Sequence, residues 1–289
     1  MTTLIHNLDQ TALEAVEPTE PIVPSAGVGK RTLLGSIRSE AKRLTRKSFT
    51  GVGLALVVFF SLMAAVVTFL AGSDAGPGAG IAVDLESAQG IVAALSMAGN
   101  LVGIVALSLW AAAVASDYST GWVRLMVAAE PRRWRLLFGK LMALSGFTIV
   151  ATIVATAIAV AMAYLLAGPA GVSTAAWSVG VFGTVLSAWL NFTLAVLGWG
   201  IIGFTVAVIS RSAIVAIAGG IGYMMVFEGL LGLLAESATT YLPGTVLNAV
   251  AAGGTAVMAY GTAVLLATGF VLAALVIAFA VFARRDITS

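Results

Sequence analysis

Three polar side chains interrupt long apolar stretches of the sequence, and chemistry inside a membrane would have to involve them. They are Asn100, Asn191 and Glu228. An ionisable group is costly to place in a bilayer, so it usually marks an ion path, a proton relay or a substrate contact. One carboxylate and two amides do not make a carboxylate–histidine relay or an ion-coupled site. If the protein is a pump, it cannot couple transport to protons or sodium and must draw its energy from another source. The alternative is that the protein is a passive structure.

The same three residues are expected to have mainly structural roles. Asn100 and Asn191 are typical of amides that form hydrogen bonds between packed helices, rather than of ligands. Glu228 lies far along its apolar stretch. We interpret it as an interfacial carboxylate or as one satisfied by neighbouring hydroxyl groups, with a gate or a substrate contact as the alternative.

Two glycine-rich stretches match nucleotide-binding patterns only in part. Residues 198–203 have the GxGxxG spacing, but they lie within an apolar stretch and not between a strand and a helix. There the glycines are expected to allow close helix packing or a kink, and Gly99 with Gly103 forms a GxxxG step that supports helix contact. Residues 24–32 (PSAGVGKRT) lack the first glycine and the Ser/Thr of a P-loop. The sequence therefore predicts no ATP site in this chain.

The composition is that of a membrane protein. The 289 residues are 60% hydrophobic and 10% charged, with a mean hydropathy of +1.05, whereas a soluble domain is about a quarter charged. There is no cysteine, and the one histidine is His6, so we expect no disulfide, no metal site and no cofactor bound by this chain. An intramembrane enzyme would need polar catalytic groups that the apolar stretches do not supply.

Six apolar stretches must position the residues above. Each reaches the roughly 20 residues that a helix needs to cross the hydrocarbon core. They lie at about 50–71, 90–116, 141–167, 180–209, 213–235 and 262–283. The sequence thus predicts an all-α integral membrane fold with one transmembrane domain at 30–289. Residues 1–29 are acidic and contain prolines, which predicts a disordered cytoplasmic tail rather than a signal peptide.

The positive charges predict the orientation of the six stretches. All 15 lysines and arginines lie before the first stretch, between the second and third, between the fourth and fifth, or after the sixth. The segments 72–89, 168–179 and 236–261 carry none. Because cytoplasmic loops are enriched in Lys and Arg, both termini are predicted to be cytoplasmic. This distribution also argues against a nucleic-acid partner, despite a pI of about 9.1.

Two predicted cytoplasmic segments have helical patterns of their own. Residues 31–47 place apolar residues at helical spacing among several basic ones, which is typical of a helix that lies in the membrane interface. In residues 117–140 one helical face is apolar, and Pro131 favours the start of a new helix after Glu130. A topology anchor or interfacial helix is one interpretation of these segments, and a docking surface for a soluble partner is the other.

Four sequence features, in this order, resemble the permease subunits of ATP-binding cassette (ABC) exporters of the ABC-2 type. They are IRSEAKRLTRKS at 37–48, the stretch from Gly121 to Lys140, YLPGTVLNAV at 241–250 and FARRDI at 282–287. The resemblance covers residues 31–289.

The resemblance implies a permease that pairs with a second copy or homologue and docks a separate cytoplasmic ATPase, which would bind ATP and Mg. It implies a connecting helix at 31–47, a coupling helix at 117–130 and short helices at 229–255 that dip into the outer leaflet. The residues expected to couple to the ATPase are Glu40, Asp117, Gly121, Glu130, Pro131, Arg132 and Arg133.

The function expected from these features is export of an amphipathic, drug-like or lipid-like substrate across the plasma membrane. A non-transporting membrane scaffold, immunity or sensor subunit with the same fold is the alternative. The sequence names neither the substrate nor the choice between homodimer and heterodimer.

Overall fold

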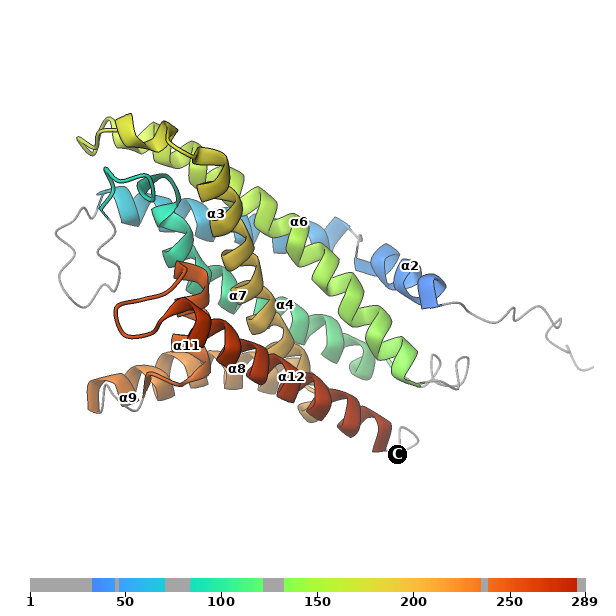
Figure 1. Cartoon of the computed structure of the whole chain (residues 1–289). Coiled ribbons are helices and arrows are strands. Elements are labelled where there is room, and N and C mark those ends of the chain that lie inside the picture. Colours follow the sequence, from blue (N-terminus) through green and yellow to red (C-terminus); the bar gives the residue numbers. More distant parts are fainter. Residues whose placement is uncertain (1–32, 45–46, 71–83, 122–132, 235–238, 285–289) are drawn as a thin grey trace, which may run out of the picture. The chain divides into compact units, whose positions relative to one another are not determined.

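The computed structural model describes residues 33–44, 47–70, 84–121, 133–234 and 239–284, and these ranges belong to one compact unit, Leu33–Ser289 (Figure 1). All regular elements within them are helical. Residues 1–29, for which a tail was predicted, lie outside the described ranges.

Within the described ranges, six helices are long and apolar enough to cross a membrane, as predicted. Their bounds in the structure are α3 (Lys47–Leu70), α4 (Ala93–Ser119), α6 (Arg133–Ala167), α7 (Val181–Ser210), α8 (Ala213–Gly222) with its continuation, and α12 (Tyr260–Arg284). A π-helical turn at Tyr223–Glu228 continues α8 into α9 (Gly229–Leu234). The protein is therefore a multi-pass membrane protein.

Two further helices do not cross the bundle. The predicted connecting helix is α2 (Leu33–Leu44), which is amphipathic and precedes α3. Among the short helices expected at 229–255, α11 (Pro243–Ala252) packs against α4, α7 and α12, with Val246 and Leu247 almost completely buried. Short 3-10 turns at Gly90–Val92 and Ala175–Ser178 precede α4 and α7.

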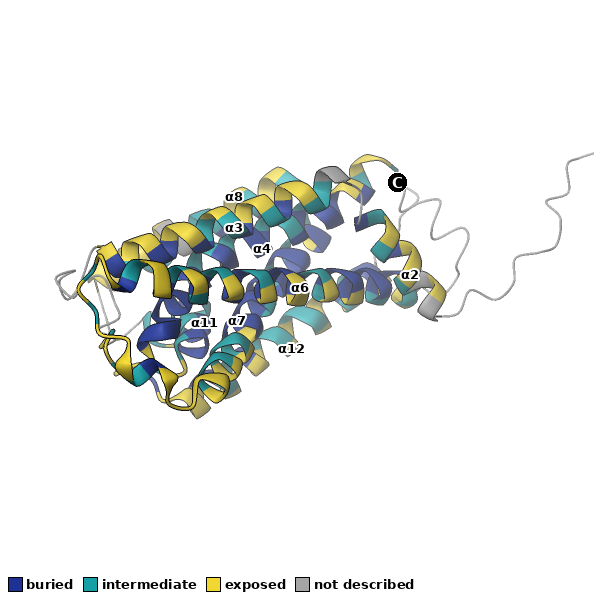
Figure 2. Cartoon of the chain, turned by 90° about the horizontal axis from the view of Figure 1, so that it is seen from above, coloured by how far each residue is buried: buried dark blue, intermediate teal, exposed yellow. Residues whose placement is uncertain are grey.

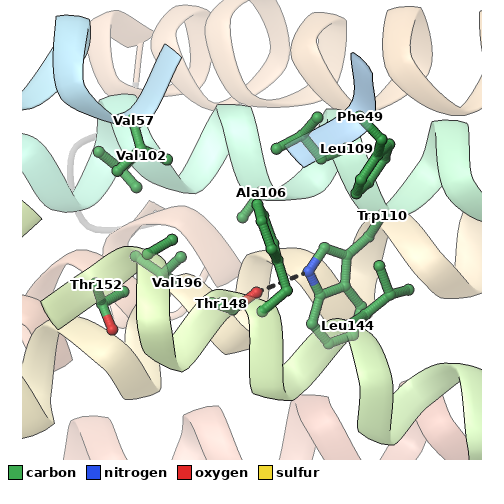
Figure 3. Close-up of a pocket in the computed structure, with 12 residues that line it drawn as sticks. Phe49, Val57, Val102, Ala106, Leu109, Trp110, Leu144, Thr148, Thr152 and Val196 are labelled. Carbon is green, nitrogen blue, oxygen red and sulfur yellow. Dashed lines mark hydrogen bonds between the residues drawn. The ribbon is translucent and has the colours of Figure 1, made fainter. Parts of the chain in front are cut away.

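The centre of the bundle consists of α4 and α7, which are mostly buried, whereas α8 and α12 are mostly exposed. Figure 2 shows the exposed residues on the outer helices. Aromatic side chains fill the centre, with Trp110 of α4 edge-on to Phe204 of α7 at 6.2 Å between ring centroids. The Trp110 indole Nε1 donates a 3.0 Å hydrogen bond to Thr148 Oγ1 of α6, beside an apolar pocket (Figure 3).

The predicted packing role of the glycines in α7 is confirmed. A Cβ at Gly200 would lie 2.6 Å from the Trp110 ring, and a Cβ at Gly203 would overlap the backbone carbonyl oxygen of Leu107. In the reverse direction, a Cβ at Gly103 of α4 would overlap the ring of Trp199. The GxGxxG stretch therefore lets two helices approach at backbone distance, as small residues do at helix interfaces in membranes.

The boundaries of the predicted 117–140 loop are wrong at both ends. Helix α4 continues to Ser119 and α6 begins at Arg133, so Asp117 and Lys140 belong to the long helices rather than to a loop. The reason is that each charge has a buried partner on another helix, described below, so the helices extend through charged positions. Gly121 follows α4 with a φ of +69°, a left-handed conformation that suits glycine. Residues 122–130 of the predicted coupling helix lie outside the described ranges.

Candidate functional site

Helix α2 packs against one end of the bundle, chiefly against α6. Its apolar face carries Ala41 and Leu44, which contact the core near α6. Glu40 lies on this same face and is 2% exposed. A carboxylate that is removed from water to this degree needs a charged or hydrogen-bonding partner, and the neighbouring helices supply it.

Glu40, Arg43, Asp117 and Lys140, from α2, α4 and α6, form a single charge cluster. Arg43 donates from one guanidinium nitrogen to Glu40 Oε1 at 3.1 Å and from the other to Asp117 Oδ1 at 2.7 Å. Lys140 donates from Nζ to Asp117 Oδ2, and its Nζ lies 3.9 Å from Glu40 Oε2. Each carboxylate therefore contacts both cations, and the charge cluster ties three helices together.

The electrostatics of the charge cluster depend on this pairing. Glu40, Asp117 and Lys140 are each less than a tenth exposed, whereas a third of the Arg43 side chain is accessible. Burial lowers the pKa of Arg43, but the hydrogen bond and charge of Asp117, followed by those of Glu40, outweigh it and raise that pKa overall. Two carboxylates and two cations give no net charge, which limits the desolvation cost of burying them.

The ends of several helices meet around the charge cluster. Phe282 near the end of α12 lines a small cavity together with Asp117 and Lys140. The guanidinium of Arg211, which follows α7, lies 5.8 Å from the ring centroid of Tyr118. At the opposite end Trp177 Nε1 donates to the backbone oxygen of Leu85 at 2.9 Å. The described basic segments thus share one end of the bundle, the end predicted to face the cytoplasm.

The structure places the predicted coupling residues in three different situations. Glu40 and Asp117 are buried in the charge cluster, so direct contact with an ATPase would require the charge cluster to open. Gly121 lies at the end of α4. Glu130, Pro131 and Arg132 lie outside the described ranges, and Arg133 is the first residue of α6.

The sequence reasoning missed Arg43 and Lys140 as members of this site. In the sequence they count as positive charges that predict the topology and as parts of the segments 37–48 and 121–140, and neither is a predicted site residue. The signal for Lys140 is its position seven residues after the start of α6, within an apolar helix, where a lone ammonium would be costly. For Arg43 the signal is its spacing of three residues from Glu40, which favours an ion pair on one helix.

Glu228 has a partner on the short helix α11. Its Oε1 accepts a 2.9 Å hydrogen bond from the backbone N–H of Gly244, in the first turn of α11. Tyr223 also forms a side-chain hydrogen bond with Glu228. The interpretation that neighbouring hydroxyls satisfy this carboxylate is confirmed in part, since the backbone of α11 contributes as well. Leu242, the N-cap residue of α11, makes no side-chain hydrogen bond to the helix, so Glu228 supplies the acceptor from another helix.

The two intramembrane amides, Asn191 and Asn100, differ in their hydrogen bonding. Asn191 Oδ1 of α7 accepts a 2.6 Å hydrogen bond from the Tyr260 hydroxyl at the start of α12, which confirms a role between helices. Asn100 is half-buried on α4, and within the described ranges no hydrogen bond of its side chain is found. Those ranges also contain no group of three or more acidic or histidine side chains placed to hold a metal ion.

We expect Glu228→Ala to destabilise the protein by about 1–3 kcal/mol, because a buried backbone N–H of α11 loses its acceptor. Glu228→Gln keeps an oxygen acceptor and is expected to lie close to the wild type. Thermal unfolding of the detergent-purified variants measures both. An equal loss in the two variants would mean that the negative charge, rather than the hydrogen bond, matters.

Comparison with known proteins identifies one family, whose function is unknown. The family model described as a protein of unknown function, DUF2705, matches residues 51–288. The chain therefore belongs to this family. No curated protein matches the sequence.

Proposed function

We propose that this member of the DUF2705 family is the permease subunit of an ABC exporter of the ABC-2 type. It would move an amphipathic, drug-like or lipid-like substrate out of the cytoplasm across the plasma membrane. A second copy or a homologue would complete the pathway. A separate cytoplasmic ATPase subunit would bind ATP and Mg and supply the energy.

The observation that carries this proposal is the charge cluster. It fixes α2, the candidate connecting helix, to the end of α4 and the first turns of α6. Helix α4 ends within residues 117–130, the segment that resembles the coupling helix, and α6 begins three residues after it. A partner that grips this segment would therefore act on α2, α4 and α6 as one unit.

The packing of the bundle would allow a movement of α2, α4 and α6 to reach α7 at the centre of the bundle. Helix α4 has its most extensive contacts with α7, and α7 in turn contacts α11 and α12. Because α4 and α7 touch at backbone distance at Gly203, a displacement of α4 must displace α7. In this proposal, closure of the ATPase dimer pushes on residues 117–130 and on α2, and α4 transmits the movement to the predicted substrate pathway.

Purification of the tagged chain from its native membrane tests the proposal directly. The expected result is a co-purifying ATPase whose ATP hydrolysis depends on the permease. The same sample reveals whether a second, different permease is present. A chain that repeatedly purifies alone, without ATPase activity, would overturn the proposal in favour of the scaffold, immunity or sensor alternative.

The double substitution Arg132→Glu with Arg133→Glu is expected to abolish ATPase co-purification, because it reverses the charges of two residues that are expected to contact the ATPase. The reversed charges lie at the predicted membrane surface, so the variant is expected to remain folded in the membrane. The measurement is the ATPase-to-permease ratio after affinity purification. Arg284→Glu, at the exposed end of α12, is the control. Unchanged ATPase recovery in the double variant would contradict the assignment of Arg132 and Arg133 to the contact with the ATPase.

A further inference from the structure

An open cavity of about 420 Å³ lies beside the charge cluster, where α2 and α3 meet α4 and α6. Its volume is within the range of about 300–1,000 Å³ that small-molecule sites occupy. All four members of the charge cluster line it, together with an apolar wall that includes Phe49, Val52 and Leu109. The cavity is therefore amphipathic.

The polar and apolar parts of the cavity are separated along α4. Leu109 and Asp117 both line it, and their eight-residue separation corresponds to about 12 Å along a helix. Asp117 lies near the end of α4, whereas Leu109 lies more than two turns inside the spanning helix. A ligand with a polar head at the membrane surface and an apolar part toward the membrane interior fits this arrangement.

The cavity opens to the outside of the bundle. Val52 lines it and is 56% exposed, on the first turns of the spanning part of α3. A third of the Arg43 side chain is also accessible. A membrane-spanning helix exposes such apolar residues to lipid, so the nearest molecules able to enter are the lipids of the surrounding leaflet.

We propose that this cavity binds a phospholipid, with its phosphate at Arg43 and one acyl chain along Phe49, Val52 and Leu109. An arginine that is partly accessible at a helix end is a suitable partner for a phosphodiester. A free phosphate is a poorer match, because it would leave the apolar wall of Phe49, Val52 and Leu109 uncovered.

Native mass spectrometry after stepwise delipidation in detergent tests the proposal on the full chain. The wild type is expected to retain one phospholipid per chain. Val52→Trp places a large side chain at the mouth of the cavity. Excluding two or more methylene groups of the lipid is expected to weaken retention by about tenfold or more. Val276→Trp, on the exposed face of α12, adds the same side chain elsewhere and is expected to retain the lipid.

Three results would overturn the proposal. The first is a wild type without a retained phospholipid, and the second is equal retention in the two tryptophan variants. The third is a Val52→Trp variant that keeps the lipid but shifts from dimer to monomer, which would assign the cavity to a contact between copies.

Competition with diacylglycerol tests the role of the phosphate. Diacylglycerol has the same chains without the phosphate, so it is expected to displace the retained phospholipid poorly. Displacement as efficient as that by a phospholipid would contradict the assignment to Arg43. Neither measurement involves ATPase or substrate, so both are independent of the proposed transport function.

Discussion

Replacing Asp117 by alanine is expected to lower the free energy of unfolding by about 3–5 kcal/mol, the usual cost of removing one partner from a buried ion pair. Asp117 is 6% exposed and accepts hydrogen bonds from both Arg43 and Lys140. Lys140 is 7% exposed and its Nζ lies 3.9 Å from Glu40 Oε2, so the lost interaction is replaced only weakly. The measurement is chemical denaturation of the purified variant in detergent.

A hydrophobic double substitution separates the cost of an orphaned charge from the value of the ion pair itself. Asp117→Leu with Lys140→Met removes both charges and leaves the Arg43–Glu40 pair, at 3.1 Å, in place. Because apolar residues of similar volume often replace a buried ion pair without loss, this variant is expected to be about as stable as the wild type. Lys140→Met alone is expected to be destabilised like Asp117→Ala.

The double-mutant cycle of Asp117 and Lys140 decides whether the two residues act together. Strong non-additivity is expected, since their charged atoms are in direct contact. Additive losses would mean that each residue stabilises the protein through other contacts. In that case the contact between Asp117 and Lys140 would not be what links α4 to α6.

The spans could be predicted from the sequence because a single physical requirement determines them. A helix that crosses the hydrocarbon core needs about 20 predominantly apolar residues. The six observed spans begin and end within a few residues of the predicted ones except at α6. Helix α6 starts at Arg133 rather than near 141. Its first turns contain arginines and Lys140, which hydropathy alone excludes from a span.

The charge cluster could be predicted only in part. Glu40 and Asp117 were selected because they match a family pattern, as candidates for contact with a partner. Their burial depends on how α2 folds back onto α6, a tertiary contact that no local pattern encodes. Charges near the ends of membrane helices are expected to face water or lipid headgroups, so no local pattern identifies the partners of Lys140 on two other helices.

The contacts between α4 and α7 could likewise be predicted only in part. The glycine pattern of α7 predicted close packing, but it did not identify the partner helix. The pairing of Gly103 with Trp199 and of Gly200 with Trp110 is reciprocal, a glycine on each helix accommodating a tryptophan of the other. This complementarity follows from the register between two helices about 100 residues apart, which appears only in the folded chain.

Gly203→Val is expected to destabilise the protein by about 3 kcal/mol or more, at or above the upper end of the usual cost of overpacking. A Cβ at this position would overlap the backbone carbonyl of Leu107, which cannot rotate away as a side chain can. The two central helices must therefore separate, and the neighbouring contacts of Trp110 and Phe204 are lost with them. The measurement is the unfolding free energy in detergent, with the yield of folded protein as a second readout.

Gly183→Val is the matched control, because it makes the same substitution in the same helix. No atom lies within 4 Å of a Cβ at Gly183, and the residue is exposed. Its stability is expected to stay close to that of the wild type. Equal losses at Gly183 and Gly203 would attribute the effect to valine in α7 rather than to the approach of α4. A loss confined to Gly203 would establish that the backbone contact holds the centre of the bundle together. The proposed transmission from α4 to α7 requires that contact.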